Sequence, residues 1–215
     1  MSTDFSGLET KGRSSAEITL SVWRALFFRE ALTRLFGARF AWFWLLVEPV
    51  FHVSYLLFIF TVVRVHSVGG IDTAMWLMIG MLAFFTFQRT AVQTMNAVSA
   101  NKALFAYRQV KPVDTVLVRA ALEALLMVIV SVVLLTGLAL LGHHVVPADP
   151  LEVLVSFFGL WLLGLALGLI GSVASDLAPE LGRLIHLAMM PMFIISGAMF
   201  PVASVPQPYR DWLML

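Results

Sequence analysis

Long apolar runs alternate with short polar connections along this chain. The runs cover residues 40–63, 73–95, 120–141, 153–174 and 184–200. A helix needs about 20 apolar residues to cross the hydrocarbon core of a bilayer. We therefore expect an all-α, polytopic membrane protein in which these five runs are transmembrane helices.

A shorter amphipathic pattern precedes the first run. Between Ile18 and Phe36, apolar residues recur at steps of three and four, and charged residues occupy the other side. A basic helix of this kind lies in the membrane interface, although an ordinary surface helix has the same spacing. We favour the interfacial helix because a span follows immediately. Residues 1–17 are polar, so we expect a disordered cytoplasmic tail there.

The longest polar interruption runs from Arg89 to Arg119. It holds five basic residues and one acid, Asp114. Lys and Arg enrichment beside spans marks the cytoplasmic face. We expect a short surface helix over residues 97–107, ended by Lys111-Pro112 because the residue before proline disfavours the helical region. This stretch is either a docking surface for a soluble partner or a solvated loop between two spans.

Composition and charge agree with a membrane protein whose N-terminus is cytoplasmic. Hydrophobic residues make up 60% of the chain and charged residues 13%, with a mean hydropathy of +0.91. Of the 14 Lys and Arg, only Arg64 and Arg210 fall on the expected outer side. The absence of cysteine excludes disulfides and thiol chemistry. His143-His144 has no third ligand nearby, so we expect no metal site.

Polar residues inside the spans are the candidates for function. Glu48, Pro49 and His52 lie in the first span, and Glu48 should face a helix interface or a wet cavity because a carboxylate in lipid is costly. A structural hydrogen bond and a contact with substrate explain Glu48 equally well. The second span turns polar at Gln88 and Arg89. In the third, Glu123 stands one turn after Arg119, where the two side chains could pair.

Three sequence motifs stand out along the chain. The first is R-E-x-x-x-R-x(9)-W-x-x-x-E-P-x-x-H, formed by Arg29, Glu30, Arg34, Trp44, Glu48, Pro49 and His52. The second is Tyr107 to Arg119 with Glu123, which includes Lys111, Pro112 and Asp114. The third, less specific, is Ile195 to Pro201 followed by Pro206 and Arg210. Together these motifs resemble the permease subunits of type-2 ABC exporters, and most of all the capsular polysaccharide export group. Ala41 stands where many relatives have glycine, and the sequence ends before the Asn-Pro that usually follows the outer segment.

The resemblance implies a transmembrane domain over residues 18–215, with a surface or re-entrant outer segment at 201–215 and a sixth span beyond it. It implies ATP-driven export of a lipid-linked, anionic capsular polysaccharide across the inner membrane. The implied partners are a second copy, two ATP-binding cassette subunits, membrane lipid, the polysaccharide, and periplasmic and outer-membrane export components, but no nucleic acid. No P-loop occurs in the chain, so we expect no cofactor on it, and ATP and Mg on the separate ATPase.

Aromatic and polar side chains suit a path for sugars, because rings stack on sugar faces and polar groups bind hydroxyls. The candidates for the path are Trp44, Glu48, Phe84, Phe87, Gln88 and Arg89. The candidates for coupling to the ATPase are Asn101, Lys102, Phe105 and Arg108. Arg89 itself has three alternatives: it lies in the path, it reaches the inner headgroups, or it pairs with Glu48 or Glu123.

Other functions remain open at this point. An O-antigen, a teichoic-acid-like polymer or a drug would suit the same superfamily. A membrane scaffold for polymer synthesis would show no ATP-dependent flux. An intramembrane hydrolase would need a nucleophile and a base, and Ser196 and His186 are ten residues apart on one helix.

Overall fold

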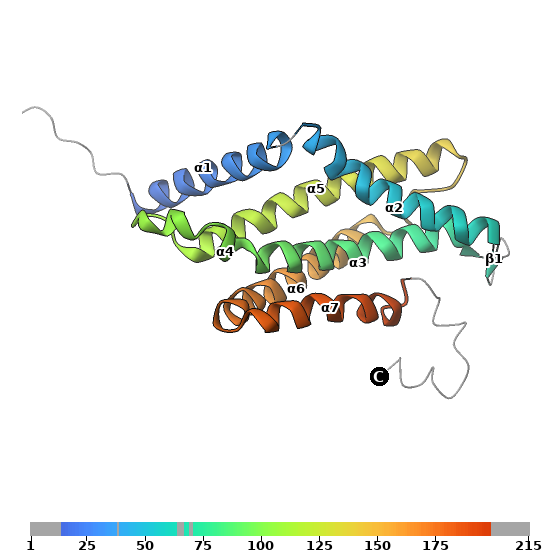
Figure 1. Ribbon diagram of the computed structural model, residues 1–215. Helices are drawn as coiled ribbons and strands as arrows, with labels where there is room; N and C mark the ends of the chain where they lie inside the picture. Colours follow the sequence, from blue (N-terminus) through green and yellow to red (C-terminus); the bar gives the residue numbers. More distant parts are fainter. Residues whose placement is uncertain (1–13, 38, 64–66, 69–70, 199–215) are drawn as a thin grey trace, which may run out of the picture.

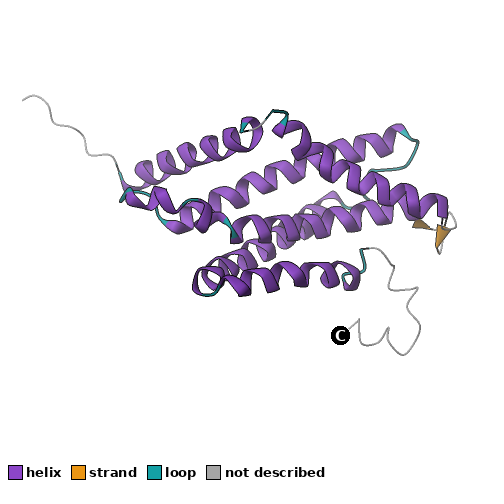
Figure 2. Ribbon diagram, in the orientation of Figure 1, coloured by secondary structure: helices purple, strands orange, loops and turns teal. Residues whose placement is uncertain are grey.

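The computed structural model describes residues 14–37, 39–63, 67–68 and 71–198. Its helices run roughly along one axis (Figure 1). Their bounds are α1 Ser15–Phe36, α2 Ala41–Val63, α3 Thr73–Met95, α4 Ala97–Ala100, the 3-10 helix η1 Lys102–Ala106, α5 Pro112–Leu140, α6 Pro150–Leu177 and α7 Pro179–Ile195. The antiparallel strands β1 Ser67–Val68 and β2 Ile71–Asp72 join α2 to α3, at one end of the bundle (Figure 2).

Within the described residues, four helices have the length and hydropathy needed to cross a membrane. They cover Ala41–Ile59, Ala74–Met95, Pro112–Leu140 and Pro150–Leu177, which correspond to the first four predicted spans. The predicted fifth span is represented by α7, which has 17 residues and contains Pro191. It ends at Ile195 with Ser196 as its C-cap, and the next residue, Gly197, takes a φ of 74° that favours glycine. The fold is thus the polytopic helical bundle that the sequence predicts, and the predicted outer segment at 201–215 lies outside the described residues.

Helix α1 begins three residues earlier than predicted. Ser14 is its N-cap and forms a capping box with Glu17. Its buried residues are Leu26 and Glu30, whereas Leu20, Phe28, Leu32 and Phe36 are exposed. Several large apolar side chains of α1 thus face away from the bundle, and this arrangement suits contact with lipid.

Helix α5 starts eight residues before the predicted span. Pro112 is tolerated in the first helical turn, and Asp114 accepts a hydrogen bond from the Lys111 N–H at 2.9 Å. The proline that we interpreted as a stop for the preceding helix is thus also the start of the next one. The predicted surface helix over residues 97–107 divides at Asn101 into α4 and η1.

Helices α3 and α6 make the closest packing in the bundle. A Cβ at Gly164 would lie 2.6 Å from the Phe87 carbonyl oxygen, and one at Gly168 would overlap the Thr94 hydroxyl. Small residues at such positions let two backbones approach each other. Gly164 and Gly168 therefore serve the packing of α6 against α3. Buried clusters on both sides of α3 complete the core, one with α2 and α5 and another with α6 and α7.

Candidate functional site

Charged side chains from α1, α3 and α5 meet inside the bundle. Glu30 binds Arg119, whose Nε donates at 2.8 Å and whose Nη2 lies 2.6 Å away. Arg34 of the same helix donates to Glu30 at 3.2 Å and also to Glu123. Glu123 is fully buried and Glu30 is 8% exposed. We call Glu30, Arg34, Arg89, Arg119 and Glu123 the charge cluster.

The pairing differs from the one the sequence predicts. Arg119 binds Glu30 of α1 instead of Glu123 on its own helix. Gln93 joins the group through its side-chain oxygen, which accepts from Arg34 at 3.0 Å, and its carbonyl, which accepts from Arg119 at 3.4 Å. The positions of the first and second motifs are thereby brought together, because Glu30 and Arg34 come from one motif and Arg119 and Glu123 from the other.

Arg89 is held less tightly than the other two arginines. Its Nε lies 3.5 Å from Glu123 Oε2, within ion-pair distance, but both atoms are buried without a hydrogen bond. Its side chain is 21% exposed, against 13% for Arg34 and 12% for Arg119. Positive charge exceeds negative charge here, because three arginines of the charge cluster face two carboxylates and a fourth, Arg29, has its Nη2 4.0 Å from Glu30 Oε2. Arg89 is the member best placed to meet an added anion.

The first predicted path residues lie on an open face of α2. Trp44, Phe51, Tyr55 and Phe58 are 53–67% exposed, and Glu48 and His52 are also exposed. The rings of Phe51 and Tyr55 stack, with centroids 6.3 Å apart, and His52 meets Phe85 edge-on at 5.4 Å. Pro49 is buried on the opposite side. A helix that crosses the membrane thus exposes a carboxylate among aromatic rings.

The other path candidates lie on α3. Phe84 and Phe87 are 7% and 6% exposed and pack against α7, with Phe84 4.9 Å from Phe193 between ring centroids. Gln88 is half-buried. Within one copy the two phenylalanines are therefore covered, and they would reach a path only if α7 moved away.

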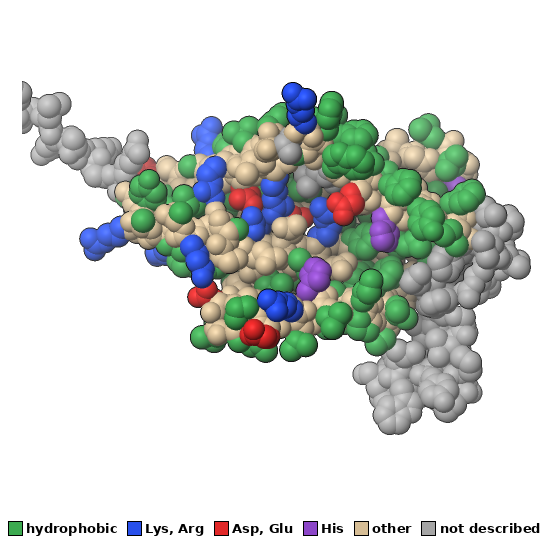
Figure 3. Space-filling view, viewed as in Figure 1, with side chains coloured by type: hydrophobic (Ala, Val, Ile, Leu, Met, Phe, Trp, Pro, Cys, Tyr) green, Lys and Arg blue, Asp and Glu red, His purple; other side chains and the backbone are tan. Residues whose placement is uncertain are grey.

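The coupling candidates lie at the end of the bundle that carries α4 (Figure 1). Lys102 and Arg108 are exposed, Phe105 is half-buried and Asn101 is buried. Lys102 forms an ion pair with Asp176 at 2.8 Å. Asp176 is in the last turns of α6, and α7 begins after Ala178 with no side-chain cap. The space-filling view shows Lys and Arg concentrated in this half of the visible face (Figure 3), as expected for the cytoplasmic side.

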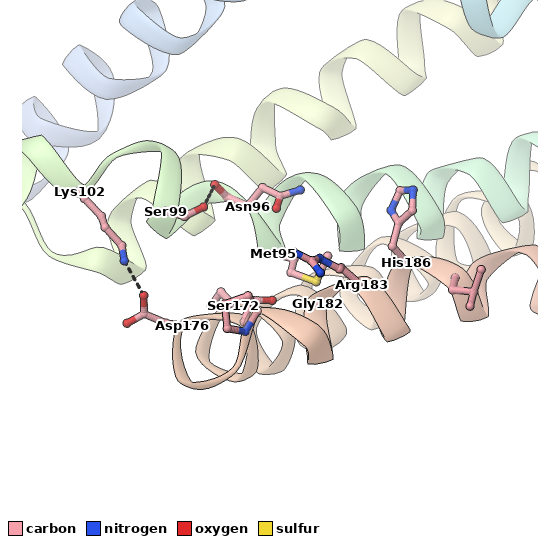
Figure 4. A pocket seen from close by; sticks show the side chains of 12 residues that line it. Met95, Asn96, Ser99, Lys102, Ser172, Asp176, Gly182, Arg183 and His186 are labelled. Carbon is pink, nitrogen blue, oxygen red and sulfur yellow. Dashed lines mark hydrogen bonds and ion pairs between the residues drawn. The ribbon is translucent and has the colours of Figure 1, made fainter.

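A pocket of about 640 Å³ opens beside this ion pair. It lies between the ends of α3 and α6 and the start of α7, and Arg183 and His186 point from α7 toward α3 (Figure 4). The Lys102–Asp176 pair closes one side of it. Ser196, the other half of the hydrolase hypothesis, is outside this pocket and donates to the Phe193 carbonyl at 2.8 Å.

Sequence reasoning missed two residues, Trp23 and Gln93, whose polar groups the structure brings to this region. In the sequence, Trp23 is one of the apolar positions of its helix and Gln93 one of the polar positions of another. Each forms a hydrogen bond with a helix distant in sequence. Asn101 was selected for coupling, and the structure adds that it accepts a hydrogen bond from Arg29. Spacing in the sequence carries no signal for these contacts. The third motif beyond Ala198, with Pro206 and Arg210, lies outside the described residues.

Comparison with known proteins agrees with this architecture. Residues 21–215 match the family of ABC-2 type transporters. The chain is 32% identical over 202 residues to the polysialic acid transport protein KpsM of Escherichia coli, covering 94% of this chain and 78% of that protein. It is 28% identical to the capsule polysaccharide export inner-membrane protein CtrC of Neisseria meningitidis, covering 89% and 72%. It is 26% identical to BexB of Haemophilus influenzae, which bears the same description, covering 96% and 79%.

A helical membrane bundle with a charged cytoplasmic end, in which residues 21–215 match this family, defines a transport permease. The chain belongs to the ABC-2 type transporter family. It is a membrane-spanning subunit, and members of this class work with an ATPase on a separate subunit. Its membrane-length helices and its inner-membrane relatives place it in the inner membrane.

Proposed function

We propose that this permease exports a lipid-linked, anionic capsular polysaccharide across the inner membrane. Its similarity to KpsM, CtrC and BexB supports this class of substrate. The net positive charge of the charge cluster suits an anion, because a fixed positive charge in a site with little water attracts a negative ligand.

The observation that carries the proposal is the open face of α2. Glu48 is exposed there beside Trp44 and Tyr55. An ionisable group facing lipid costs about 2.5–3.5 kcal/mol on insertion scales, so this face belongs next to protein or water. Aromatic rings and a carboxylate are side chains that bind the apolar faces and the hydroxyls of sugars. The α2 face therefore suits one wall of a polysaccharide path.

The proposal includes a second copy of the chain and two ATP-binding cassette subunits. In one copy Trp44, Glu48 and Tyr55 of the α2 face are exposed, and a second copy would enclose them. ATP and Mg would bind on the ATPase subunits, and this chain would hold no cofactor. Periplasmic and outer-membrane export components would receive the polymer.

A deletion and complementation experiment tests the proposed function. Loss of this gene should abolish polysaccharide on the cell surface and leave it accumulating inside, and restoring the gene should reverse both effects. Sugar analysis of the retained polymer separates a capsule from an O-antigen or a teichoic-acid-like polymer. Normal capsule on cells lacking the gene would overturn the proposal, and normal synthesis without transport would exclude a synthesis scaffold.

A further inference from the structure

Two hydrogen bonds from α1 hold the chain between α3 and α5, one at Asn101 and one at Asp114 in the first turn of α5. The indole Nε1 of Trp23 donates to Asp114 Oδ1 at 2.8 Å. One turn and a half further on, Arg29 Nη2 donates to Asn101 Oδ1. Both acceptors are buried, with Asp114 6% and Asn101 7% exposed. We call residues 97–111 the cytoplasmic segment.

Each acceptor also fixes the backbone of the segment. Asp114 Oδ2 accepts from the Lys111 N–H at 2.9 Å, which sets the start of α5. Asn101 lies between the end of α4 and the start of η1, and its Nδ2 donates to the Ala97 carbonyl at 2.8 Å. The two donors on α1 thus bind the two side chains that define the break in the segment and its end.

Helix α1 is well attached where it provides these donors. Glu30 and Arg34 anchor it to α3 and α5 through the charge cluster. A hydrogen bond to a carboxylate is stronger than one between neutral groups, as is one from a guanidinium. Helix α1 is therefore a fixed support against which the shape of the segment is set.

We propose that Trp23 and Arg29 are positioning residues, which hold the cytoplasmic segment in the shape that an ATPase subunit grips. This inference rests on the proposed function, in which the segment receives the ATPase. The side chains that would meet it, Lys102 and Arg108, are exposed on the segment. Loss of either donor leaves the backbone bonds of Asp114 and Asn101 in place, so the bundle should fold while the segment becomes looser.

The absence of cysteine makes a direct measurement feasible. A spin label on Ala103→Cys, an exposed position in η1, reports the motion of the segment in the full-length chain in lipid nanodiscs. Trp23→Phe keeps a ring but removes the donor, and Arg29→Gln shortens the side chain and removes its charge. Each should increase label mobility with and without the ATPase. Polysaccharide exported per ATP should fall about fivefold, the change that loss of a hydrogen bond of about 1 kcal/mol produces.

Matched variants separate positioning from a general loss of packing. Trp76→Phe removes the indole N–H of a residue that is as exposed as Trp23, at 38%, and lies near the start of α3, the end of that helix away from the segment. Arg24→Gln removes an exposed arginine of α1 whose guanidinium lies 5.8 Å from the Phe28 ring centroid. Neither should change label mobility or export per ATP. Arg29→Lys keeps a cationic donor and should recover part of both.

The outcomes distinguish this inference from the proposed function. Unchanged label mobility in both Trp23→Phe and Arg29→Gln would overturn the inference, whatever the exporter transports. Increased mobility with unchanged export per ATP would overturn the part that concerns the ATPase. A wild-type complex that exports no polysaccharide would instead overturn the proposed function, and the mobility measurement would still be interpretable.

Discussion

Glu123 is the residue on which the charge cluster depends most. It is fully buried and faces both Arg34 and Arg89. Removal of one partner of a buried ion pair costs about 3–5 kcal/mol, because the other charge stays buried without compensation. We predict that Glu123→Ala sharply lowers the yield of folded protein, measured by fluorescence-detected size-exclusion chromatography. Glu152→Ala, at the exposed start of α6, is the control, and equal yields would contradict the prediction.

Arg89 tests whether the cluster contacts substrate. Arg34 still neutralises Glu123 when Arg89 is removed, so Arg89→Ala should fold better than Glu123→Ala. If Arg89 lies in the path, Arg89→Ala should impair export of an anionic polymer and Arg89→Lys should retain part of it. Export normalised to membrane-inserted complex measures this. Normal export by both variants would indicate contact with headgroups, and loss of folded protein would indicate a structural pair.

The cytoplasmic segment carries the exposed positive charges of Lys102 and Arg108. Lys102→Glu with Arg108→Glu should uncouple ATP hydrolysis from export while membrane insertion stays intact. Lys102 also pairs with Asp176, and exposed pairs of this kind contribute about 0–1 kcal/mol. The exchange Lys102→Glu with Asp176→Lys restores that pair. If Lys102→Glu alone loses coupling and the exchange variant recovers it, the pair with Asp176 matters and Lys102 does not contact the ATPase.

The contact between α3 and α6 at Gly168 has no space for an added methyl group. An added methyl at Gly168 would meet Thr94 and lie 3.0 Å from the Ala91 carbonyl oxygen. Overpacking of this kind typically costs about 1–3 kcal/mol. Gly168→Ala should therefore lower the melting temperature in detergent. Gly159→Ala on the same helix is the control, because nothing lies within 4 Å of its added methyl, and equal melting temperatures would contradict the prediction.

The elements were predictable from the sequence to the extent that lipid defines them. Apolar runs such as 73–95 became α3 with the same bounds, since only backbone-satisfied helices of that length are stable in a bilayer. The start of α5 was not predicted, because Pro112 is both a stop signal and a good first helical residue. The bond between Glu30 and Arg119 was also missed, since it joins residues 89 positions apart. Local spacing suggested Arg119 and Glu123 instead.

At the scale of the whole molecule, we predict that the functional permease contains two copies. The exposed carboxylate and rings on α2 need a neighbour other than lipid. Two differently tagged copies expressed together should co-purify from membranes, and cross-linking should capture a dimer under active conditions. Copies that are mixed only after solubilisation are the control for artificial association. Capture of monomers alone would contradict the prediction.

The near-contact of backbones between α3 and α6 limits how the exporter can move. Gly164 and Gly168 bring α6 directly against the backbone of α3 and its short Thr90 and Thr94 side chains, which leaves little space to compress between the two helices. Helices separated by long side chains can shift by changing rotamers, but this pair cannot. The two helices should therefore move together as one rigid unit during a transport cycle. A passage for a polymer would then widen at the contacts of α3 and α6 with α2, α5 and α7. A small molecule that blocks export would act best by binding at those contacts.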